Sequence, residues 1–548
     1  MAQLMGQMMQ MPLSISSLIT HAARHHGDTE IVSKRVEGDL HRTTWAETEL
    51  RSRKLAQAFA RLGLAAGERV GTLAWNGYRH LEIYYGSSGS QLVCHTVNPR
   101  LFPEQIAWII GDAEDKVLCF DLTFLPLVEK LAPALKTVRH FVLMTDRAHM
   151  PAQTTIPDLL CYEELVEAEN GQYTWPEFDE NTASSICYTS GTTGNPKGAV
   201  YSHRSTVLHA FAAALPDAMA LAARDTVLPV VPMFHVNAWG LPYAAAMTGC
   251  RLVFPGPHLD GKSLYELFEN ERVSFSAGVP TVWLGLLTYV KQNNLKFSTF
   301  KRTVIGGSAC PPAMIRTLED DFGVEVIHAW GMTELSPLGT LARLKSKHDT
   351  LSREERQHIL EKQGKAVYGI DMAIVGDDGK ALAWDGKTSG DLVVRGPWVI
   401  RRYFKQEGSP LQSIDGREWF PTGDVAAIDA DAYMQITDRS KDVIKSGGEW
   451  ISSIDLENIA MAHPAVHEAA AIACRHPKWD ERPLLVVVKK PGAELTREEM
   501  LAHFEGRIAK WQIPDDVAFV AEIPHTATGK MQKLKLREQF RDYKLPTA

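Results

Sequence analysis

The chain has 548 residues, more than the roughly 250–300 at which a single hydrophobic core stops growing, so we expect at least two compact units. Hydrophobic residues make up 45% of the chain and charged residues 23%, which excludes a wholly disordered or fibrous protein. The 58 basic and 66 acidic residues give a net charge of −8, so no basic field attracts nucleic acid and we expect no such partner.

The cysteines and the apolar segments bear on the cellular compartment. The seven cysteines are scattered and form no C-x-x-C pair, which predicts reduced thiols and argues against a structural zinc site. No stretch approaches the ~18–20 consecutive apolar residues of a membrane span, and the first fourteen residues carry no lysine or arginine. We therefore expect a cytoplasmic protein without stable membrane insertion.

Residues 40–330 alternate helical patterns with short apolar runs. The helical pattern of residues 45–63 ends in Gly63, and glycine commonly terminates a helix. Strand-like runs follow at residues 69–75, 116–121, 140–146 and 184–190. This rhythm predicts βα units around largely parallel sheets, which is an α/β fold.

The pattern changes in the last third of the chain. Between residues 365 and 437, short alternating segments broken by Gly and Asp predict antiparallel hairpins or a small β-barrel. Beyond residue 440 we expect helices at 454–462 and 497–508 and strands at 469–476 and 484–490. These elements are enough for a second, smaller domain of the α/β or α+β type.

The segment from Tyr188 to Gly198, YTSGTTGNPKG, has the composition of a polyphosphate-binding loop. Glycines let backbone N–H groups approach phosphate oxygens, Ser and Thr add hydroxyl donors, and Lys197 adds a positive charge. The common P-loop ends in Gly-Lys-Ser/Thr, whereas here Pro196 precedes the lysine and Gly-Ala-Val follows it. The segment therefore indicates another class of nucleotide site, with a flexible surface loop as the alternative for a Gly-rich run on its own.

Three further segments carry side chains suited to a nucleotide, although each also has a simpler explanation. Gly306–Cys310 offers small residues against which a flat ring can lie, but a tight strand-to-helix turn explains it without a ligand. Glu334, just after Trp330, is a hard oxygen donor of the kind that binds Mg²⁺. Asp424 can accept both hydroxyls of a ribose, although aspartate in a turn is commonly only a turn former.

The order of the motifs resembles one family. The adenylate-forming superfamily has the same motifs in the same order, here spanning residues 188–530: YTSGTTGNPKG, MFHVNAW, GGSA, HAWGMTE, WFPTGD, DRSKDVIKSGGEW and HTATGK. Other segments are most similar to medium- and long-chain fatty acyl-CoA synthetases: HVNAWG, GPWVIRRYF, KSGGEWISSIDLEN, HPKWDERP and KWQIP. The chain therefore resembles an acyl-CoA ligase over nearly its whole length, most weakly over residues 1–180.

The resemblance implies a role for each matching residue. The β- and γ-phosphates of ATP are expected on Thr189, Ser190, Gly191, Thr192, Thr193, Gly194 and Lys197, with Mg²⁺ near Thr189 and Glu334. The adenine is expected beside Gly307, Ser308, Ala309, Trp330 and Gly331, the α-phosphate on Thr333, and the ribose on Asp424 and Arg439. Lys530 is the implied catalytic lysine, because its ammonium can stabilise the charge that develops when a carboxylate attacks the α-phosphate.

The resemblance also implies a mobile C-terminal domain that first supplies Lys530 and then turns another face to CoA. Lys441 matches the family's pivot, so we divide the chain into an N-terminal domain (1–437), a hinge (438–443) and a C-terminal domain (444–548). The pantetheine arm of CoA is expected along Lys445, Gly447, Gly448 and Trp450. Position alone suggests Arg475, Lys478 and Arg482 for the 3′-phosphate of CoA.

The acyl substrate is expected beside His235, Val236, Trp239, Val279 and Pro280, most of which are apolar and suit an alkyl chain. Trp239 resembles the tryptophan that gates the acyl tunnel of fatty acyl-CoA synthetases, and a core tryptophan is the alternative. Medium-chain fatty acid is our leading substrate. Ligases for the short thioether acid 3-methylmercaptopropionate contain similar sequence motifs. One methylene gives only about 1–3 kcal/mol of discrimination between substrates, so the sequence alone does not separate the two acids.

We interpret the chain as an ATP- and Mg²⁺-dependent carboxylate–CoA ligase that forms an acyl-adenylate, releases pyrophosphate, and then makes the CoA thioester with release of AMP. The alternatives are an adenylating enzyme that loads a carrier protein, and a binding protein without turnover. The second alternative requires damage at the key residues, all of which are present: Lys197, Glu334, Asp424, Arg439 and Lys530. No G-x-S-x-G or H-E-x-x-H motif indicates a hydrolase, and the resemblance favours a homodimer.

Overall fold

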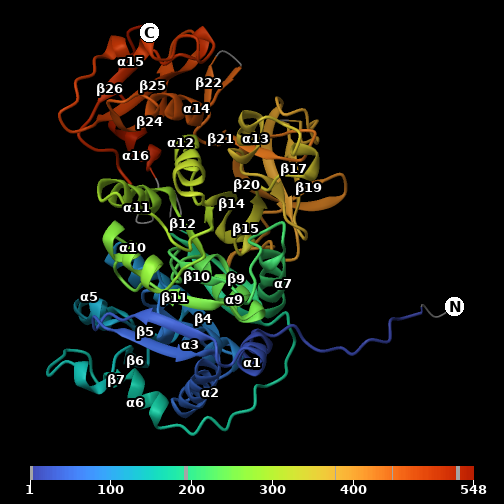
Figure 1. Ribbon diagram of the computed structural model, residues 1–548, viewed down its shortest axis with the longest axis vertical. Helices are drawn as coiled ribbons and strands as arrows, with labels where there is room; N and C mark the ends of the chain where they lie inside the picture. Colours follow the sequence, from blue (N-terminus) through green and yellow to red (C-terminus); the bar gives the residue numbers. More distant parts are fainter. Residues whose placement is uncertain (1–3, 190–194, 377, 447–448, 526–530) are drawn as a thin grey trace.

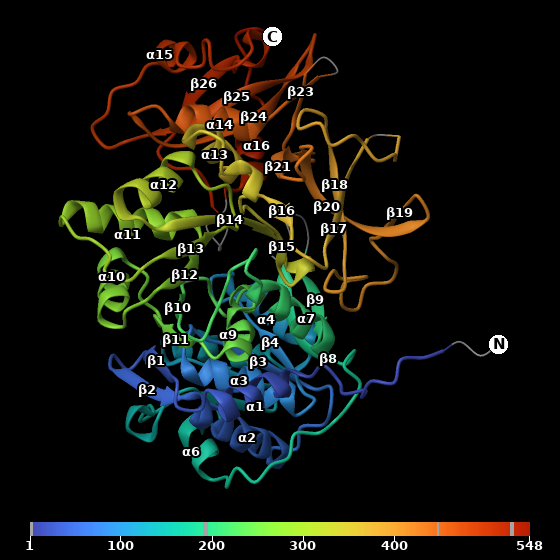
Figure 2. The same ribbon diagram turned by 45° about the vertical axis from the view of Figure 1, so that its right-hand side comes forward.

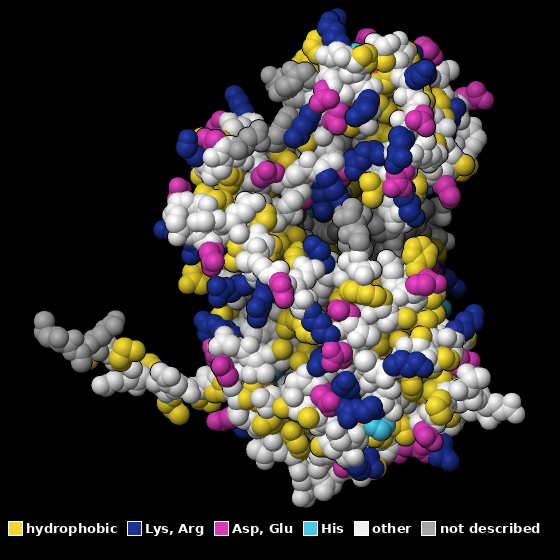
Figure 3. Space-filling view, turned by 180° about the vertical axis from the view of Figure 1, so that it is seen from behind, with side chains coloured by type: hydrophobic (Ala, Val, Ile, Leu, Met, Phe, Trp, Pro, Cys, Tyr) yellow, Lys and Arg dark blue, Asp and Glu magenta, His cyan; other side chains and the backbone are white. Residues whose placement is uncertain are grey.

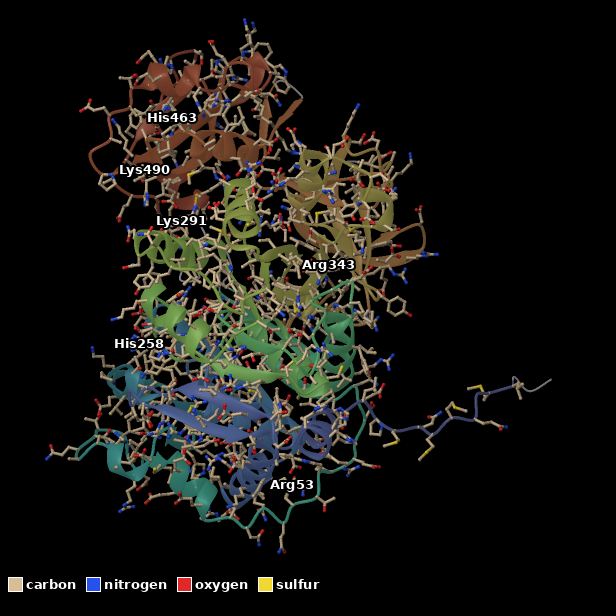
Figure 4. All side chains as sticks on the ribbon, in the orientation of Figure 1. Arg53, His258, Lys291, Arg343, His463 and Lys490 are labelled. Atoms are coloured by element: carbon tan, nitrogen blue, oxygen red, sulfur yellow. The ribbon has the colours of Figure 1, made fainter. Side chains whose placement is uncertain are left out.

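The computed structural model describes residues 4–189, 195–376, 378–446, 449–525 and 531–548. Two sheets and their helices form the large body, a group of antiparallel strands lies at its side, and the C-terminal residues form a further unit above it (Figure 1). Figure 4 marks the length of the molecule, from Arg53 on the lowest helices to His463 in the C-terminal unit. All seven cysteines are buried and unpaired, as expected for reduced thiols.

The first sheet contains the strand that leads into the polyphosphate loop. Its order is β7 (Leu160–Cys161), β6 (His140–Leu143), β5 (Asp115–Phe120), β3 (Arg69–Leu73), β4 (Val93–Thr96), β8 (Ala183–Thr189) and β9 (Lys197–Ser202). The pairs are parallel except for the antiparallel pair β8–β9. The expected parallel strands are confirmed, and the loop follows the carboxyl end of β8, where α/β sheets commonly bind ligands.

The second sheet also has a parallel centre. Its order is β2 (Leu40–Thr44), β1 (Glu30–Lys34), β11 (Arg251–Phe254), β10 (Thr226–Pro229), β12 (Phe275–Gly278), β13 (Arg302–Ile305), β14 (Glu325–Gly331), β15 (Leu338–Leu341) and β16 (Lys365–Ala366). Only the pairs β1–β2, β14–β15 and β15–β16 are antiparallel among these strands. Strands β13 and β14 end at the GGSAC and WGMTE motifs, so both motifs lie at one edge of the sheet.

Helices fill three layers around the two sheets. The middle layer contains α1 (Ile15–His25), α2 (Trp45–Arg61), α3 (Tyr78–Gly89), α7 (His203–Ala214) and α9 (Leu241–Thr248). The outer face of the first sheet packs on α4 (Pro103–Ala113) and α5 (Leu125–Leu131), and that of the second sheet on α10 (Gly261–Asn270), α11 (Pro280–Gln292) and α12 (Pro312–Arg316). Because neighbouring strand residues point to opposite faces, Val304 joins the middle core and Ile305 the outer one.

The region predicted as hairpins or a barrel forms an antiparallel sheet beside the body (Figure 2). It contains β17 (Asp371–Val375), β18 (Ser389–Arg395), β19 (Gln412–Ile414), β20 (Arg417–Ile428) and β21 (Met434–Arg439), preceded by α13 (Arg353–Leu360). Its inner face shares a hydrophobic core with β9 and the turn after β14. This shared core brings strand β20 next to the ends of the motif-bearing strands.

The C-terminal unit has its own sheet and core. The strands are β23 (Glu449–Ile451), β22 (Ile444–Ser446), β25 (Asp480–Lys489), β24 (Val466–His476) and β26 (Asp516–Phe519), with helices α14 (Ser453–Met461), α15 (Arg497–Ala502) and α16 (Lys533–Gln539). The helix predicted at 497–508 was too long: α15 ends at Ala502, and a turn follows in which Gly506 has a φ of +74°. Because a residue at positive φ lies inside the predicted span, the α-helix does not continue to residue 508 as apolar periodicity alone suggested.

Candidate active site

The polyphosphate end of the site begins where β8 pairs with β9. Thr189, the last residue of β8, lies opposite Lys197, the first of β9. The expected ligands between them, Ser190, Gly191, Thr192, Thr193 and Gly194, lie outside the described residues. The Lys197 ammonium lies 5.0 Å from the ring centroid of Tyr403, and the residue is exposed. A cation–π contact of this kind holds a lysine in place without neutralising its charge, so the cation can still bind an anion.

Glu334 lies on a 3-10 turn, η5 (Thr333–Leu335), directly after β14. Its carboxylate is buried and accepts a hydrogen bond of 2.7 Å from the Tyr403 hydroxyl to Oε1. Burial, and next the charge of Glu334, raise the pKa of Tyr403, so the phenol stays protonated and donates. Tyr201 also donates a hydrogen bond of 2.6 Å to the backbone oxygen of Thr333, which fixes η5 against β9.

Our sequence interpretation missed Tyr403, although it lies in the segment GPWVIRRYF on which the resemblance partly rests. Its ring contacts the cation of Lys197 and its hydroxyl contacts the carboxylate of Glu334. One tyrosine therefore links the expected phosphate-binding cation to the expected metal-binding anion.

The expected ribose residues lie on paired strands. The register of β20 and β21 sets Asp424 opposite Arg439, and Arg439 Nε lies 2.9 Å from Asp424 Oδ1. Trp330 Nε1 donates a hydrogen bond of 2.9 Å to Asp424 Oδ2. Asp424 is only 3% exposed, so one hydrogen bond and one ion pair fix the orientation of a buried carboxylate. The structure thus brings Trp330, Asp424 and Arg439 together from three strands.

The predicted acyl and adenine residues share a boundary. A Cβ on Gly306 would come within 3.3 Å of Trp239 Cη2, and a Cβ on Gly307 within 3.7 Å of Trp239 Cζ2 and 3.1 Å of Val279 Cγ1. The indole of Trp239 therefore lies against the glycine pair at the end of β13, with Val279 beside it. Larger side chains at the two glycines would displace this ring.

The remaining members of these two groups lie around that boundary. Ser308 and Ala309 are exposed after β13, Pro280 is buried at the start of α11, and Val236 is buried in α8 (Val236–Trp239), for which His235 is the N-cap. A Cβ on Gly331 would come within 2.2 Å of the Pro337 backbone oxygen. Close backbone packing is therefore sufficient to explain this glycine.

The residues expected to bind CoA lie on the C-terminal unit, apart from the nucleotide residues. Lys445 on β22 pairs with Trp450 on β23, and its backbone N–H donates to Glu481 Oε2 at 2.8 Å. Figure 1 shows β22 in the upper unit and Figure 2 shows its partner β23 there, both away from β14 in the body. Gly447, Gly448 and the catalytic candidate Lys530 lie outside the described residues.

The cations suggested for the 3′-phosphate of CoA differ in their surroundings. Arg482 is 11% exposed at its side chain, pairs with Asp515 at 2.6 Å, and donates to Ser446 Oγ at 3.2 Å and to the Ile513 backbone oxygen at 3.1 Å. These bonds occupy its donors, so the structure contradicts the suggestion that Arg482 binds a phosphate. Arg475 and Lys478 are exposed on the surface, where an anion can reach them.

The hinge candidate Lys441 lies in the short connection between β21 and β22. Its backbone oxygen accepts a hydrogen bond of 3.1 Å from Arg537, which also pairs with Asp442 at 2.8 Å. Across the same connection, the Asp438 carboxylate accepts hydrogen bonds from the N–H and hydroxyl of Ser453, the first residue of α14. These few polar contacts hold the C-terminal unit against the end of β21.

The donor set fits Mg²⁺ and a polyanion. Mg²⁺ prefers hard oxygen ligands and is commonly held by one or two protein groups together with phosphate oxygens. The buried Glu334 carboxylate and the Thr189 hydroxyl are ligands of this kind, and η5 lies against β8. Figure 3 shows basic and acidic side chains interspersed over the face of the molecule seen from behind.

Comparison with known proteins shows that two parts of the chain match known protein families. Residues 19–404 match the AMP-binding enzyme family, and residues 455–530 match the AMP-binding enzyme C-terminal domain. A 3-methylmercaptopropionyl-CoA ligase of Ruegeria lacuscaerulensis is 55% identical over 539 residues, covering 98% of this chain and 99% of the relative. A medium-chain-fatty-acid–CoA ligase of Ectopseudomonas oleovorans is 54% identical over 540 residues, covering 98% of both.

The fold is also found in solved structures. The anthranilate CoA ligase AuaEII in complex with anthranoyl-AMP superposes with a TM-score of 0.84 at 23% identity, over 97% of this chain and 98% of the other. The shared architecture confirms the expected α/β fold with a large N-terminal and a small C-terminal part. Within the described residues, no helix combines the length and apolar character needed to cross a bilayer.

Proposed function

The chain belongs to the AMP-binding enzyme family as an AMP-forming acid–thiol ligase that uses ATP and CoA, and we propose that its acid is a medium-chain fatty acid. The observation that supports this substrate is the apolar wall formed by Trp239 and Val279 against the glycine pair at the end of β13. An alkyl chain gains from contact with such a wall in proportion to the apolar area that it buries. A charged or strongly polar acid would gain nothing there.

The first half-reaction is carboxylate attack on ATP. A carboxylate oxygen bonds to the α-phosphorus while the bond from that phosphorus to the pyrophosphate oxygen breaks, giving acyl-adenylate and pyrophosphate. In our proposal, Lys197 and the loop from Thr189 to Gly194 hold the departing phosphates, and Thr333 and Lys530 contact the α-phosphate. Bringing two anions together is the electrostatic difficulty of this step, and fixed cations and N–H donors relieve it.

The nucleoside is held by Asp424. Its Oδ2 accepts a hydrogen bond of 2.9 Å from Trp330, and its Oδ1 lies 2.9 Å from Arg439 Nε in an ion pair. A carboxylate has about four acceptor positions, so positions remain for the two ribose hydroxyls. Mg²⁺ at Glu334 and Thr189 would neutralise phosphate charge, and Tyr403 would keep the Glu334 carboxylate oriented toward it.

The second half-reaction makes the thioester. The CoA sulfur attacks the acyl carbon as the thiol loses its proton, and the bond from that carbon to the AMP oxygen breaks. We propose that residues 444–548 rotate about a hinge at 438–443, with Lys441 as pivot, so that Lys445, Gly447, Gly448 and Trp450 meet the adenylate. The short connection between β21 and β22 and its few polar contacts support this division.

A second candidate acid is 3-methylmercaptopropionate. The relative from Ruegeria lacuscaerulensis, named as a ligase of that acid, is as similar to this chain as the medium-chain enzyme is. Both acids present an apolar tail to the same wall, and they differ in length. We also propose, from the family resemblance, that the enzyme is a cytoplasmic homodimer, which sedimentation velocity of the pure protein tests.

Labelled oxygen tests the proposed chemistry. Octanoate carrying oxygen-18 in both carboxylate oxygens is incubated with the enzyme, ATP, Mg²⁺ and CoA, and the products are resolved by mass spectrometry. Attack on the α-phosphorus predicts one labelled oxygen in AMP, none in pyrophosphate, and octanoyl-CoA equal in amount to AMP. Label in inorganic phosphate together with ADP, or no octanoyl-CoA, would contradict the proposal.

A further inference from the structure

A left-handed turn carries the tryptophan of the acyl wall. The φ angles of Val236, Asn237, Ala238, Trp239 and Gly240 are +48°, +50°, +50°, +56° and +75°. Residues with a Cβ rarely adopt this region even singly, because the Cβ approaches the following carbonyl oxygen. Four such residues in succession persist only where the surroundings hold them, and such conformations cluster at functional sites.

Asn237 connects this turn to the strand of the polyphosphate loop. Its side-chain amide donates a hydrogen bond of 3.0 Å to Ser185 Oγ, and its Oδ1 lies 3.4 Å from the Cys187 sulfur, which donates to it. Ser185 and Cys187 alternate along β8, so both face the turn, and β8 ends two residues later at Thr189. Asparagine is also the non-glycine residue of the turn that best tolerates a positive φ.

The far end of the turn is held as tightly. A Cβ on Gly240 would come within 2.7 Å of His209 Cε1, so the backbone lies directly on that buried ring. Between the two anchors, Trp239 projects onto Gly306 and Gly307. The position of the indole therefore depends on a backbone segment that is fixed from both sides.

We propose that Asn237 is a positioning residue for selection of the acid. Its amide, bonded to β8, holds the left-handed turn and thereby sets where Trp239 closes the acyl site. Asn237 is 3% exposed and does not reach a substrate, so it acts through Trp239. The inference rests on the proposed function, because selection among acids is what Trp239 is proposed to perform.

Two substitutions separate the amide from the backbone conformation. Asn237→Ala removes the side-chain bonds and the tolerance of positive φ, whereas Asn237→Gly removes the bonds but adopts positive φ freely. In both variants we expect the ratio of kcat/KM for octanoate over butyrate to fall roughly three- to tenfold. This factor corresponds to the net contribution of one lost hydrogen bond. The KM for ATP should stay within about twofold, because Thr189 and Lys197 are untouched.

The Trp239→Ala background tests whether the effect passes through the indole. If Asn237 acts by placing Trp239, then Asn237→Ala changes the octanoate-to-butyrate ratio in wild type but not in Trp239→Ala, a coupling that a double-mutant cycle detects. Ser185→Ala, which removes the acceptor of the amide and leaves Asn237 in place, should reproduce the fall in the ratio if the asparagine variants fold poorly.

Asn294→Gly is the matched control. Asn294 also has a positive φ, +52°, but is exposed in the turn after α11, so the same chemical change should leave the ratio unaltered. If Asn237 is only structural, its variants should have a lower thermal midpoint and an unchanged octanoate-to-butyrate ratio, which would overturn the proposal. Equal effects of Asn237→Ala on this ratio in wild type and in Trp239→Ala would overturn it as well. A wild-type enzyme that makes no thioester from any acid would instead refute the proposed function.

Discussion

Tyr403→Phe isolates one hydroxyl at the junction of the phosphate and metal sites. The substitution removes the donor that lies 2.7 Å from Glu334 Oε1 but keeps the ring beneath the Lys197 ammonium. A hydrogen bond to a charged, buried group contributes about 1.5–3 kcal/mol, so we expect adenylation at limiting MgATP to slow roughly ten- to hundredfold. The KM for the acid should change little, because the hydrogen bond of the tyrosine hydroxyl goes to Glu334 and not to the residues of the acyl wall.

The assay is single-turnover release of pyrophosphate at saturating octanoate, with MgATP and free Mg²⁺ varied independently. Tyr368→Phe is the matched control: this tyrosine is 88% exposed, and its hydroxyl has no hydrogen bond among the described residues. Adenylation within twofold of wild type in Tyr403→Phe at every Mg²⁺ concentration would refute the role given to Glu334 and its tyrosine. A change confined to the KM of the acid would refute it equally.

Four further outcomes follow from the same geometry. Lys530→Ala should abolish adenylation yet leave thioester formation from supplied octanoyl-adenylate largely intact; equal loss of both steps would remove its assigned role. Asp424→Ala, which removes the carboxylate bonded to Trp330 and ion-paired with Arg439, should raise the KM for ATP more than about tenfold without altering the acid profile. Gly240→Ala should lower the thermal midpoint more than Gly492→Ala, because both have φ near +74° but only the first meets His209. Burial lowers the pKa of His209 to about 4, so as the pH falls the unfolded chain protonates this histidine before the folded chain does. The contribution of His209 to the free energy of unfolding is therefore full above pH 6.5 and should be lost toward pH 4, which urea titrations measure. A free energy of unfolding that does not change over this range would contradict this.

The framework of the site was predictable from local sequence. Short apolar runs predicted β8 and β13 and placed the GGSAC motif at a strand end, because buried parallel strands read as short apolar runs. The strand β14 before the WGMTE motif was not predicted. The pairing of Asp424 with Arg439 also follows from two strand-like segments joined by a short turn. The composition of these segments indicates which residues are candidate ligands, but it does not predict where their side chains lie relative to one another.

The contacts that orient those candidates depend on long-range packing. Tyr403 is 69 residues from Glu334, and Asn237 is 52 residues from Ser185, and no local pattern marks either pair. The left-handed turn at residues 236–240 was equally hidden, because Val236, Ala238 and Trp239 do not favour a positive φ, and Asn237 and Gly240 alone do not predict five such residues in succession. Arg482 shows the reverse error, because its sequence position suggested a phosphate ligand while Asp515 and Ser446 occupy its guanidinium.

Competition between two acids tests the central claim most directly. Equimolar octanoate and 3-methylmercaptopropionate compete for limiting CoA in one reaction, and the ratio of the two thioesters, measured early by mass spectrometry, equals the ratio of their kcat/KM values. Octanoate has three more chain atoms, and burial of about 0.8 kcal/mol per methylene predicts a preference of roughly fiftyfold for octanoyl-CoA. A majority of 3-methylmercaptopropionyl-CoA would contradict the medium-chain assignment, while leaving the ligase chemistry in place.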